Sequence, residues 1–430
     1  MGLREKIQDR TAVVGIIGLG YVGLPLAVEF ARAGFTVLGV DVDERRVGLL
    51  RDRRSYVQDV PERDVAHFVD NGRLAATTDY KVLKKVDAIS ICVPTPLRKT
   101  RDPDIHYIAD ATAKIRECIH SQLLVTLEST TYPGTTDEIL LPEFEASGLK
   151  VGKDIYLAFS PERVDPGNPR YNTRNTPKII GGVTPECTAL AKQLYENVVE
   201  RVIPVSSTRS AEMVKLLENT FRAINIGLVN EIAIICDKLG IDVWEVIEAA
   251  ATKPFGFMPF YPGPGLGGHC IPIDPLYLSW KLKLFNYNAR FIELASEVNT
   301  HMPEYVVEKV GRSLNRMRKP INGSRILILG VAYKRNIDDM RESPALDIIK
   351  LLQQEGAEVE YTDPYVAQLR MDGTTMCSQA LTPDRLRSCD CAVVVTDHDS
   401  FDYAMVARES ALVVDCRNAV RTKGPNIVKL

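Results

Sequence analysis

Residues 12–41 read AVVGIIGLGYVGLPLAVEFARAGFTVLGVD, and this stretch decides the fold of the N-terminal part of the chain. The apolar run 12–17 predicts a buried strand, and GLGYVG at 18–23 predicts a glycine turn that opens a helix ending at Gly34. A second apolar run, 35–40, ends in Asp41. Strand, glycine turn, helix, strand and acid in this order predict a dinucleotide-binding α/β unit.

Each glycine of the turn has its own expected task. Gly18 makes the turn, Gly20 lets the backbone approach a pyrophosphate, and Gly23 packs the helix on the strand. Asp41 would bind a ribose hydroxyl and repel a 2′-phosphate, which favours NAD over NADP, although Arg45 and Arg46 lie nearby and weaken this preference. The predicted cofactor residues of this unit are Gly18, Gly20, Tyr21, Val22, Gly23, Asp41 and Arg46.

Polar residues follow three further apolar runs, at the points where the predicted strands end. Pro94 and Thr95 follow the run 87–93, Thr130 follows 123–127, and Glu162 follows 155–159. In a doubly wound sheet the ligand lies at the carboxyl ends of the strands, so Pro94, Thr95 and Thr130 are expected near the cofactor and Glu162 in a site. The alternative is that these residues only cap the helices or turns that follow.

Length and charge limit the class of protein. A chain of 430 residues predicts two or three domains, and 45% hydrophobic with 25% charged residues is typical of a globular protein. A net charge of −3 and a pI near 6.2 argue against general binding to nucleic acid or to an anionic membrane. The charged start MGLREKIQDR and the lack of a long apolar run predict a cytoplasmic protein. The nine cysteines are scattered, which predicts reduced thiols and no metal site.

The middle of the chain changes to long helical patterns. Residues 210–239 form one such pattern without proline, and 290–318 form another, so this segment could bury apolar stripes against a second subunit. Lys215 and Asn219 are four residues apart and therefore project from one helix face. A lysine in such a place is most often solvated, so the pattern alone gives it no role.

A second α/β region follows KPINGS at 319–324. RILIL at 325–329 predicts a strand that ends in Gly330, but the GVAYKR that follows is not a dinucleotide fingerprint, so this region is expected to bind a nucleotide of another kind. Ser343 and Pro344 predict the start of a helix. Lys334, Arg335 and Arg341 supply positive charge, or are ordinary surface residues.

The second decisive stretch is YPGPGLGGHCIPIDP at 261–275. Its prolines and glycines exclude a helix or a central strand, so it is a shaped loop that presents Cys270, with His269 before it and Asp274 four residues later. A cysteine beside charge-tuning groups in a glycine-rich loop is a candidate nucleophile. The alternative is a structural loop with an incidental cysteine.

Taken together, the chain resembles the UDP-glucose/GDP-mannose dehydrogenase family. The motifs that carry the resemblance are GLGYVG with Asp41, VPTP at 93–96, EST at 128–130, SPER at 160–163, the Lys215/Asn219 helix, GLGGHCIPIDP at 265–275 and AYKRNIDDMRESP at 332–344. The resemblance implies an α/β fold of two Rossmann-like domains joined by a central helical dimerisation segment. The expected bounds are 1–206 for the NAD-binding domain, 207–319 for the helical segment with the catalytic loop, and 320–430 for the UDP-sugar-binding domain.

The implied reaction is oxidation of a sugar-nucleotide C6 alcohol to a carboxylate with two NAD consumed. Passing a second hydride from the aldehyde level needs a thiohemiacetal, for which Cys270 is the nucleophile. Glu162 or Asp274 would orient the water that hydrolyses the thioester. Lys215 with Asn219 would stabilise the oxyanion at C6, and Thr130 would hold a water or the alcohol.

These motifs define the identity of the substrate's sugar less closely than they define the reaction. His269 and Ile273 stand where members acting on UDP-glucose or GDP-mannose usually carry Ser and Lys, and the stretch is similar to the UDP-N-acetylhexosamine branch, closest to UDP-N-acetylglucosamine 6-dehydrogenases. UDP-N-acetylmannosamine and UDP-glucose stay open. The product would feed the biosynthesis of a surface polysaccharide or of a glycosylated natural product. The expected substrate-binding residues are Glu162, Arg163, Lys215, Asn219, Tyr261, Gly265, Gly267, Arg290, Lys334 and Arg335.

Two other functions are compatible with the scaffold. A non-catalytic protein that binds NAD and a nucleotide sugar would be expected to have lost Cys270, Lys215 or Asp274, and all three are present. A two-electron dehydrogenase that stops at the aldehyde would not need the cysteine. The expected partners are therefore a UDP-sugar and a second copy of the chain.

Overall fold

The computed structural model describes residues 1–98, 102–165, 168, 170–371 and 373–430. The chain divides into two compact units, one of residues 1–218 with 276–285 and one of residues 219–275 with 286–430. Two helices run from one unit into the other, α8 (Thr208–Leu239) and α10 (Asp274–Lys283). The central segment predicted as a domain of its own is thus divided between the units, and the three predicted domain bounds stay a prediction.

The first unit is built on an eight-stranded sheet. Its strands are β1 (Val13–Ile17), β2 (Thr36–Val40), β3 (Leu74–Thr77), β4 (Ala88–Ile91), β5 (Leu124–Leu127), β6 (Tyr156–Phe159), β7 (Lys178–Gly182) and β8 (Val202–Pro204). Its helices are α1 (Leu3–Gln8), α2 (Gly23–Arg32), α3 (Glu44–Arg51), α4 (Glu62–Asp70), α5 (His106–Arg116), α6 (Leu141–Glu145) and α7 (Pro185–Tyr195), with a 3-10 turn η1 (Tyr80–Lys85) and a π turn η2 (Thr136–Leu140).

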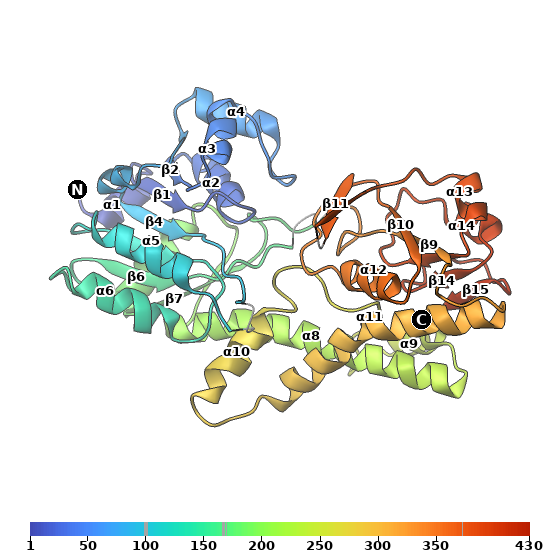
Figure 1. The fold of residues 1–430 in the computed structure, drawn as a ribbon. Coiled ribbons are helices and arrows are strands. Elements are labelled where there is room, and N and C mark those ends of the chain that lie inside the picture. Colours follow the sequence, from blue (N-terminus) through green and yellow to red (C-terminus); the bar gives the residue numbers. More distant parts are fainter. Residues whose placement is uncertain (99–101, 166–167, 169, 372) are drawn as a thin grey trace. The chain divides into compact units, whose positions relative to one another are not determined.

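The strand order of this sheet is β3-β2-β1-β4-β5-β6-β7-β8, parallel except for the β6–β7 pair. Its first six strands have the order of dinucleotide-binding folds, with the direction of winding reversed between β1 and β4. Figure 1 shows α2, α3 and α4 on one side of the strands and α5 and α6 on the other. With both faces covered, β4, β5 and β6 are buried along their whole length, which is why they read as continuous apolar runs.

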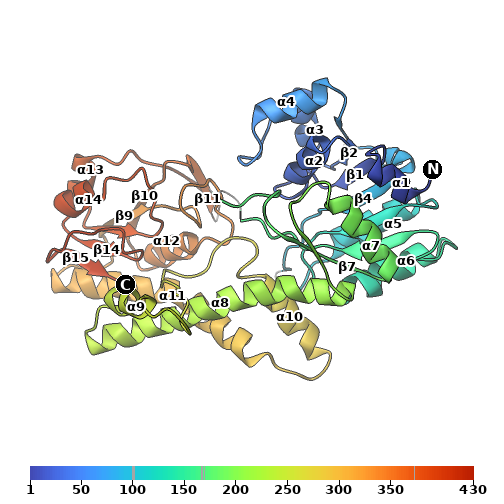
Figure 2. The ribbon, with the colours of Figure 1, turned by 180° about the vertical axis from the view of Figure 1, so that it is seen from behind.

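The second unit has a five-stranded parallel sheet and a two-stranded hairpin. Its strands are β9 (Arg325–Leu329), β10 (Glu358–Thr362), β11 (Gln368–Met371), β12 (Thr374–Cys377), β13 (Cys391–Val394), β14 (Val413–Asp415) and β15 (Ile427–Lys429). Its helices, besides its parts of α8 and α10, are α9 (Val243–Ala251), α11 (Arg290–Arg316), α12 (Pro344–Gln354), α13 (Pro383–Ser388) and α14 (Tyr403–Glu409). Figure 2 shows this unit from behind, with α8, α9 and α11 along one side of it.

Successive side chains of β9 are buried in two different hydrophobic cores, one on each face of the sheet. Ile326 and Ile328 join the cluster that includes α11 and α12, whereas Leu327 and Leu329 join the cluster that includes α13 and α14. The sheet order β10-β9-β13-β14-β15 reverses its winding between β9 and β13, so the fold places a second ligand edge beyond these two strands. Both Rossmann-like α/β units predicted from the sequence are therefore confirmed.

Candidate active site

The glycine turn after β1 is shaped by two close approaches and one open space. Gly18 has φ of +87°, and a Cβ there would lie 2.6 Å from the carbonyl oxygen of Cys92. A Cβ on Gly23 would lie 1.8 Å from the carbonyl oxygen of Gly18. A Cβ on Gly20, in contrast, would meet only Arg46, at 4.0 Å, so this peptide faces free space. Val22 caps α2 without a side-chain acceptor, which leaves the helix N-terminus to a ligand's phosphates.

Asp41 holds the turn to the end of β2. Its Oδ2 accepts the N–H of Leu19 at 2.7 Å and its Oδ1 accepts that of Asp43 at 2.9 Å. Arg46 lies 3.4 Å from Asp41 and 3.6 Å from Asp43, so its charge is directed to these carboxylates. An arginine so engaged is not preorganised for a 2′-phosphate, which supports the predicted preference for NAD. The residues present fit a dinucleotide's pyrophosphate and ribose.

Replacing Gly18 with alanine is expected to weaken NADH binding at least tenfold, measured by fluorescence titration. The added Cβ would meet Cys92 and the residue would hold an unfavourable φ. Gly48→Ala is the matched control, because that glycine lies inside α3 with nothing within 4 Å of its Cβ position. It should bind NADH as the parent does and unfold at a slightly higher temperature. Equal affinity in both variants would contradict this placement of the cofactor.

The ends of β4 and β5 are tied together. Ser129 Oγ donates to the carbonyl oxygen of Val93 at 2.8 Å, and Tyr277 Oη of α10 donates to that of Thr95 at 2.9 Å. Pro94 is exposed, Thr95 is buried, and Thr130 is half-buried. The predicted cofactor residues of these loops therefore share one edge of the sheet with the glycine turn.

Lys215 is held at the same edge. Glu212, one turn earlier on α8, accepts N–H groups of Gly134 and Thr136 at 2.5 and 3.0 Å, which anchors the start of the helix to the first unit. Lys215 Nζ then donates to the carbonyl oxygen of Glu162 at 2.7 Å. The lysine is only 9% exposed, so the usual solvated position that the pattern suggested does not apply.

The SPER loop is fixed by its own side chains. Glu162 Oε1 accepts the N–H groups of Arg163 and Val164 at 2.8 and 2.7 Å. The guanidinium of Arg163 donates to Glu218 at 2.6 Å and to the carbonyl oxygen of Pro177 at 2.6 Å. Arg163 is thus engaged in bonds that shape the loop, and its predicted contact with substrate stays a prediction.

The loop 261–275 has neither helix nor strand before Asp274, as its glycines and prolines predict. The N–H of Gly263 donates to Asn230 Oδ1 at 2.9 Å, and that of Gly268 donates to the carbonyl oxygen of Arg341 at 2.9 Å. Added Cβ atoms on Gly267 and Gly268 would lie 2.6 and 2.7 Å from the side chain of Tyr333. The glycines are therefore needed because the loop packs directly against the 332–344 segment.

Cys270 and Asp274 lie one helical turn apart. The N–H of Asp274 donates to the carbonyl oxygen of Cys270 at 2.8 Å, and α10 begins at this residue. Asn219 Nδ2 donates to Asp274 Oδ2 at 2.5 Å, so the carboxylate is oriented by α8. Cys270 is half-buried and not in a disulfide. A thiol one helical turn before a fixed carboxylate can add to a carbonyl and later be released by hydrolysis.

The ligand edge of the second sheet carries an acid of its own. Asp363 Oδ2, after β10, accepts the N–H groups of Val331 and Ala332 at 2.8 and 3.0 Å. His398 Nδ1 accepts the N–H of Asn336, so its Nε2 donates to Asp363, at 3.0 Å. Burial alone would raise the pKa of Asp363, but these bonds together lower it. This acid stabilises the turn after β9.

Positive charge surrounds that edge unevenly. Arg335 is paired with Asp397 and lies 3.5 Å from Asp399. Lys334 is half-buried. Arg290, the first residue of α11, and Tyr261 are both exposed. The ring of Tyr261 stacks on that of Trp244, with 6.2 Å between the two ring centroids. Gly265 is buried, and a Cβ there would lie 3.2 Å from Pro344. The predicted roles of these residues toward substrate stay predictions.

Two residues escaped the sequence analysis. Lys178, at the start of β7, is buried and donates a hydrogen bond to Glu128. Glu128 is the first residue of the EST motif, in which the sequence analysis assigned a role only to Thr130. A lysine at the head of the apolar run KIIGG was the signal available. Arg417 packs beside Gly263, donates to the carbonyl oxygen of Val395 at 2.8 Å, and has its pKa lowered by burial. Among the described residues, no cluster of His, Cys, Asp or Glu could hold a metal ion.

Family models match three successive parts of the chain. They are the NAD-binding domain (residues 12–199), the central domain (209–301) and the UDP-binding domain (327–422) of the UDP-glucose/GDP-mannose dehydrogenase family.

The part of the chain that the structure describes has no helix long and apolar enough to cross a membrane.

The sequence matches to similar proteins cover most of this chain and most of each relative. The UDP-N-acetyl-D-mannosamine dehydrogenase of Methanococcus maripaludis is 38% identical over 90% of this chain and 86% of its own. The UDP-N-acetyl-D-glucosamine 6-dehydrogenase of Pseudomonas aeruginosa is 36% identical over 82% and 83%. The solved structure of a UDP-D-ManNAc dehydrogenase from Pyrococcus horikoshii superposes with a TM-score of 0.89, at 32% identity over 97% of this chain and 98% of its own.

Proposed function

The chain belongs to the UDP-glucose/GDP-mannose dehydrogenase family and is an NAD-dependent nucleotide-sugar dehydrogenase, and we propose that it oxidises the C6 hydroxyl of a UDP-N-acetylhexosamine to a carboxylate. The observation that carries the proposal is the position of Cys270. It lies in a glycine-rich loop, one helical turn before Asp274, whose carboxylate is oriented by a hydrogen bond. A two-electron dehydrogenase would not need this thiol. The overall change is RCH₂OH + 2 NAD⁺ + H₂O → RCOO⁻ + 2 NADH + 3 H⁺.

The residues of the first unit bind the cofactor and act on the alcohol. When bound, NAD would supply a hydride acceptor for each of the two oxidations. The open face of Gly20 and the N-terminus of α2 would receive its phosphates, and Asp41 a ribose hydroxyl. Lys215, fixed by its bond to the carbonyl of Glu162, stabilises negative charge on the C6 oxygen. Thr130 holds the alcohol or a water.

The residues of the catalytic loop act at the aldehyde level. The Cys270 thiolate adds to C6 and forms the thiohemiacetal, and loss of the second hydride from that carbon gives a thioester. A water then attacks the thioester carbonyl, its proton passes to a carboxylate, and the C–S bond breaks to release the thiolate. Glu162 and Asp274 are the candidate carboxylates, and Asn219 orients the second of them.

Two epimers are candidates for the sugar. The mannosamine names of the Methanococcus relative and of the Pyrococcus structure support UDP-N-acetylmannosamine. His269, Ile273 and the Pseudomonas relative support UDP-N-acetylglucosamine, the epimer that the sequence favours. Epimers differ in one hydroxyl or amide position, which a single pocket residue can discriminate.

The test is NADH formation with each sugar nucleotide. Purified protein with NAD is given UDP-N-acetylmannosamine, UDP-N-acetylglucosamine, UDP-glucose or GDP-mannose, and product mass is followed with absorbance. We expect two NADH per uronate from one of the N-acetylhexosamines. One NADH per aldehyde would establish the two-electron alternative, and no NADH with any of the four would favour a non-catalytic binding protein.

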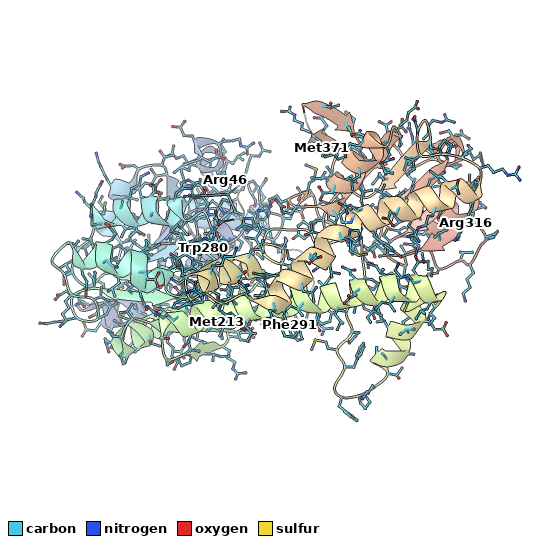
Figure 3. The ribbon with its side chains drawn as sticks, turned by 60° about the horizontal axis from the view of Figure 1, so that its bottom comes forward. Arg46, Met213, Trp280, Phe291, Arg316 and Met371 are labelled. Atoms are coloured by element: carbon cyan, nitrogen blue, oxygen red, sulfur yellow. The ribbon has the colours of Figure 1, made fainter. Side chains whose placement is uncertain are left out.

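We also propose that the protein is a homodimer that buries the stripe Phe221, Leu228, Ile235 and Leu239 of α8. These side chains repeat every four or seven residues, so they share one helix face, and each is between 43% and 67% exposed. Phe291 of α11, labelled in Figure 3, is 75% exposed. Contiguous exposed apolar residues of this size mark an interface.

Replacing both Leu228 and Ile235 with aspartate is therefore expected to halve the mass in light scattering after gel filtration, because it places charge in the apolar stripe. Val42→Asp is the matched control, since Val42 is an exposed apolar residue outside the stripe. Its mass should equal that of the parent protein. A parent protein that is already monomeric would overturn the dimer.

A further inference from the structure

A buried chain of polar side chains crosses the first unit from its core to the SPER loop. Ser90 on β4 and Tyr195 on α7 have their hydroxyl oxygens 2.9 Å apart, and Tyr195 donates to Glu128 Oε1. The other oxygen, Glu128 Oε2, accepts from Lys178 Nζ at 2.6 Å. Lys178 Nζ also lies 3.7 Å from Glu162 Oε2. One ammonium group therefore faces two carboxylates.

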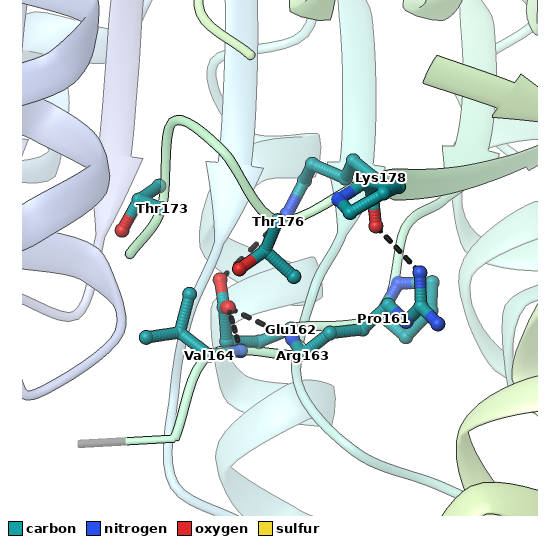
Figure 4. Close-up of a pocket in the computed structure, with 8 residues that line it drawn as sticks. Pro161, Glu162, Arg163, Val164, Thr173, Thr176 and Lys178 are labelled. Atoms are coloured by element: carbon teal, nitrogen blue, oxygen red, sulfur yellow. Dashed lines mark hydrogen bonds and ion pairs between the residues drawn. The ribbon is translucent and has the colours of Figure 1, made fainter. Parts of the chain in front are cut away.

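The two carboxylates differ in access to water. The side chain of Glu128 is 0% exposed and that of Lys178 is 5% exposed, whereas that of Glu162 is 15% exposed. Glu162 also lines a small hollow together with Lys178, Thr173 and Thr176 (Figure 4). Of these three charged groups, Glu162 is the one placed to meet a water that reacts.

Lys178 is charged in this setting. Burial alone would lower the pKa of its ammonium, but the carboxylates of Glu128 and Glu162 outweigh burial and raise that pKa above its ordinary value. Glu128 is the nearer of the two carboxylates, at 2.6 Å, and Glu162 is the second carboxylate that this ammonium faces.

Both oxygens of Glu162 are positioned. Oε1 is fixed by the two backbone N–H groups of Arg163 and Val164, and Oε2 faces the ammonium of Lys178. A carboxylate held in this way keeps one rotamer, which is what a base for water needs.

We propose that Lys178 is a positioning residue that holds Glu162 oriented as the base for hydrolysis of the thioester. The inference rests on the proposed function, because it assigns Lys178 to one step of that reaction. In this step the water oxygen bonds to the thioester carbon, its proton passes to Glu162 Oε2, and the C–S bond to Cys270 breaks with the electron pair on sulfur. The ammonium of Lys178 keeps its own protons throughout.

The test separates hydrolysis from the two oxidations. In Lys178→Met, pre-steady-state mixing with NAD and the sugar nucleotide should give a burst of two NADH per site. A steady state slowed roughly 10- to 100-fold should follow, the range seen when a hydrogen-bond partner that orients a metal ligand is lost. Acid quench and intact-protein mass spectrometry should then find the acylated chain, and KM should fall together with kcat, because hydrolysis of the acyl-enzyme limits turnover. Lys178→Arg keeps the charge and should restore most of the rate.

Two further variants keep the result decisive. Lys178→Met alone leaves Glu128 buried without its partner, so Glu128→Gln/Lys178→Met removes both charges and restores a neutral core. If Lys178 acts on Glu162, this folded double variant still accumulates the acyl-enzyme. A double variant with the parent's steady-state rate and no adduct would show that Lys178 serves the fold alone, and would overturn the inference.

The control and the parent protein separate the two proposals. Lys192→Met removes a half-buried lysine of α7 that pairs with Glu196, and should turn over as the parent does. If the parent forms no NADH with any sugar nucleotide, the proposed function fails. If the parent forms two NADH and no Lys178 variant accumulates adduct, only the role of Lys178 fails.

Discussion

Cys270→Ala is expected to lose turnover by a factor on the order of 10³ or more, as is usual when a covalent nucleophile is removed. Without the thiol, no thiohemiacetal forms at C6, so the second hydride has no tetrahedral donor. The half-buried side chain is small, and the loop is held by bonds of Gly263 and Gly268 that the substitution leaves in place. The folded protein should therefore still bind NADH and the sugar nucleotide.

The measurement is NADH per uronate in steady state, with the aldehyde trapped by a hydrazine reagent. At most one NADH per trapped aldehyde should form in Cys270→Ala, against two per uronate in the parent. Cys377→Ala is the matched control, because Cys377 lies exposed on β12 of the same unit. Retention of two NADH per uronate in Cys270→Ala would rule out covalent catalysis by this thiol.

Lys215→Met is expected to lower kcat by about 10²- to 10³-fold, the cost of removing one group that stabilises a developing oxyanion. Methionine has a similar length and keeps the packing on α8, but it cannot donate to the carbonyl oxygen of Glu162 or stabilise charge on the C6 oxygen. Because the interaction is strongest when charge develops, KM should change much less than kcat.

Single-turnover rates with saturating NAD and sugar nucleotide give the comparison. Lys238→Met on the last turn of the same helix is the matched control, since Lys238 is exposed, and its loss should cost only a few tenths of a kcal/mol of stability. An unchanged first-turnover rate in Lys215→Met would show that the lysine only supports the SPER loop.

The features that sequence reasoning predicted well are local in the chain. A glycine with φ of +87° at Gly18 and the loop at 261–275 depend on the backbone preferences of glycine and proline, which neighbouring residues already express. The helix predicted at 210–239 is present as Thr208–Leu239, and Ser343 caps α12 as its hydroxyl suggested. The hairpin β11–β12 was missed, because its short strands carry no apolar run.

The sequence by itself determined the two α/β units, the cofactor turn and the loop of Cys270, because each is written in residues close together along the chain. Only the tertiary structure decided that Lys178 meets Glu128, 50 residues away, and Glu162, and that Lys215 bonds to the backbone of Glu162. A lysine is ordinarily solvated, and its burial depends on which strands become neighbours in the sheet. That order follows from long-range packing, which no local pattern expresses.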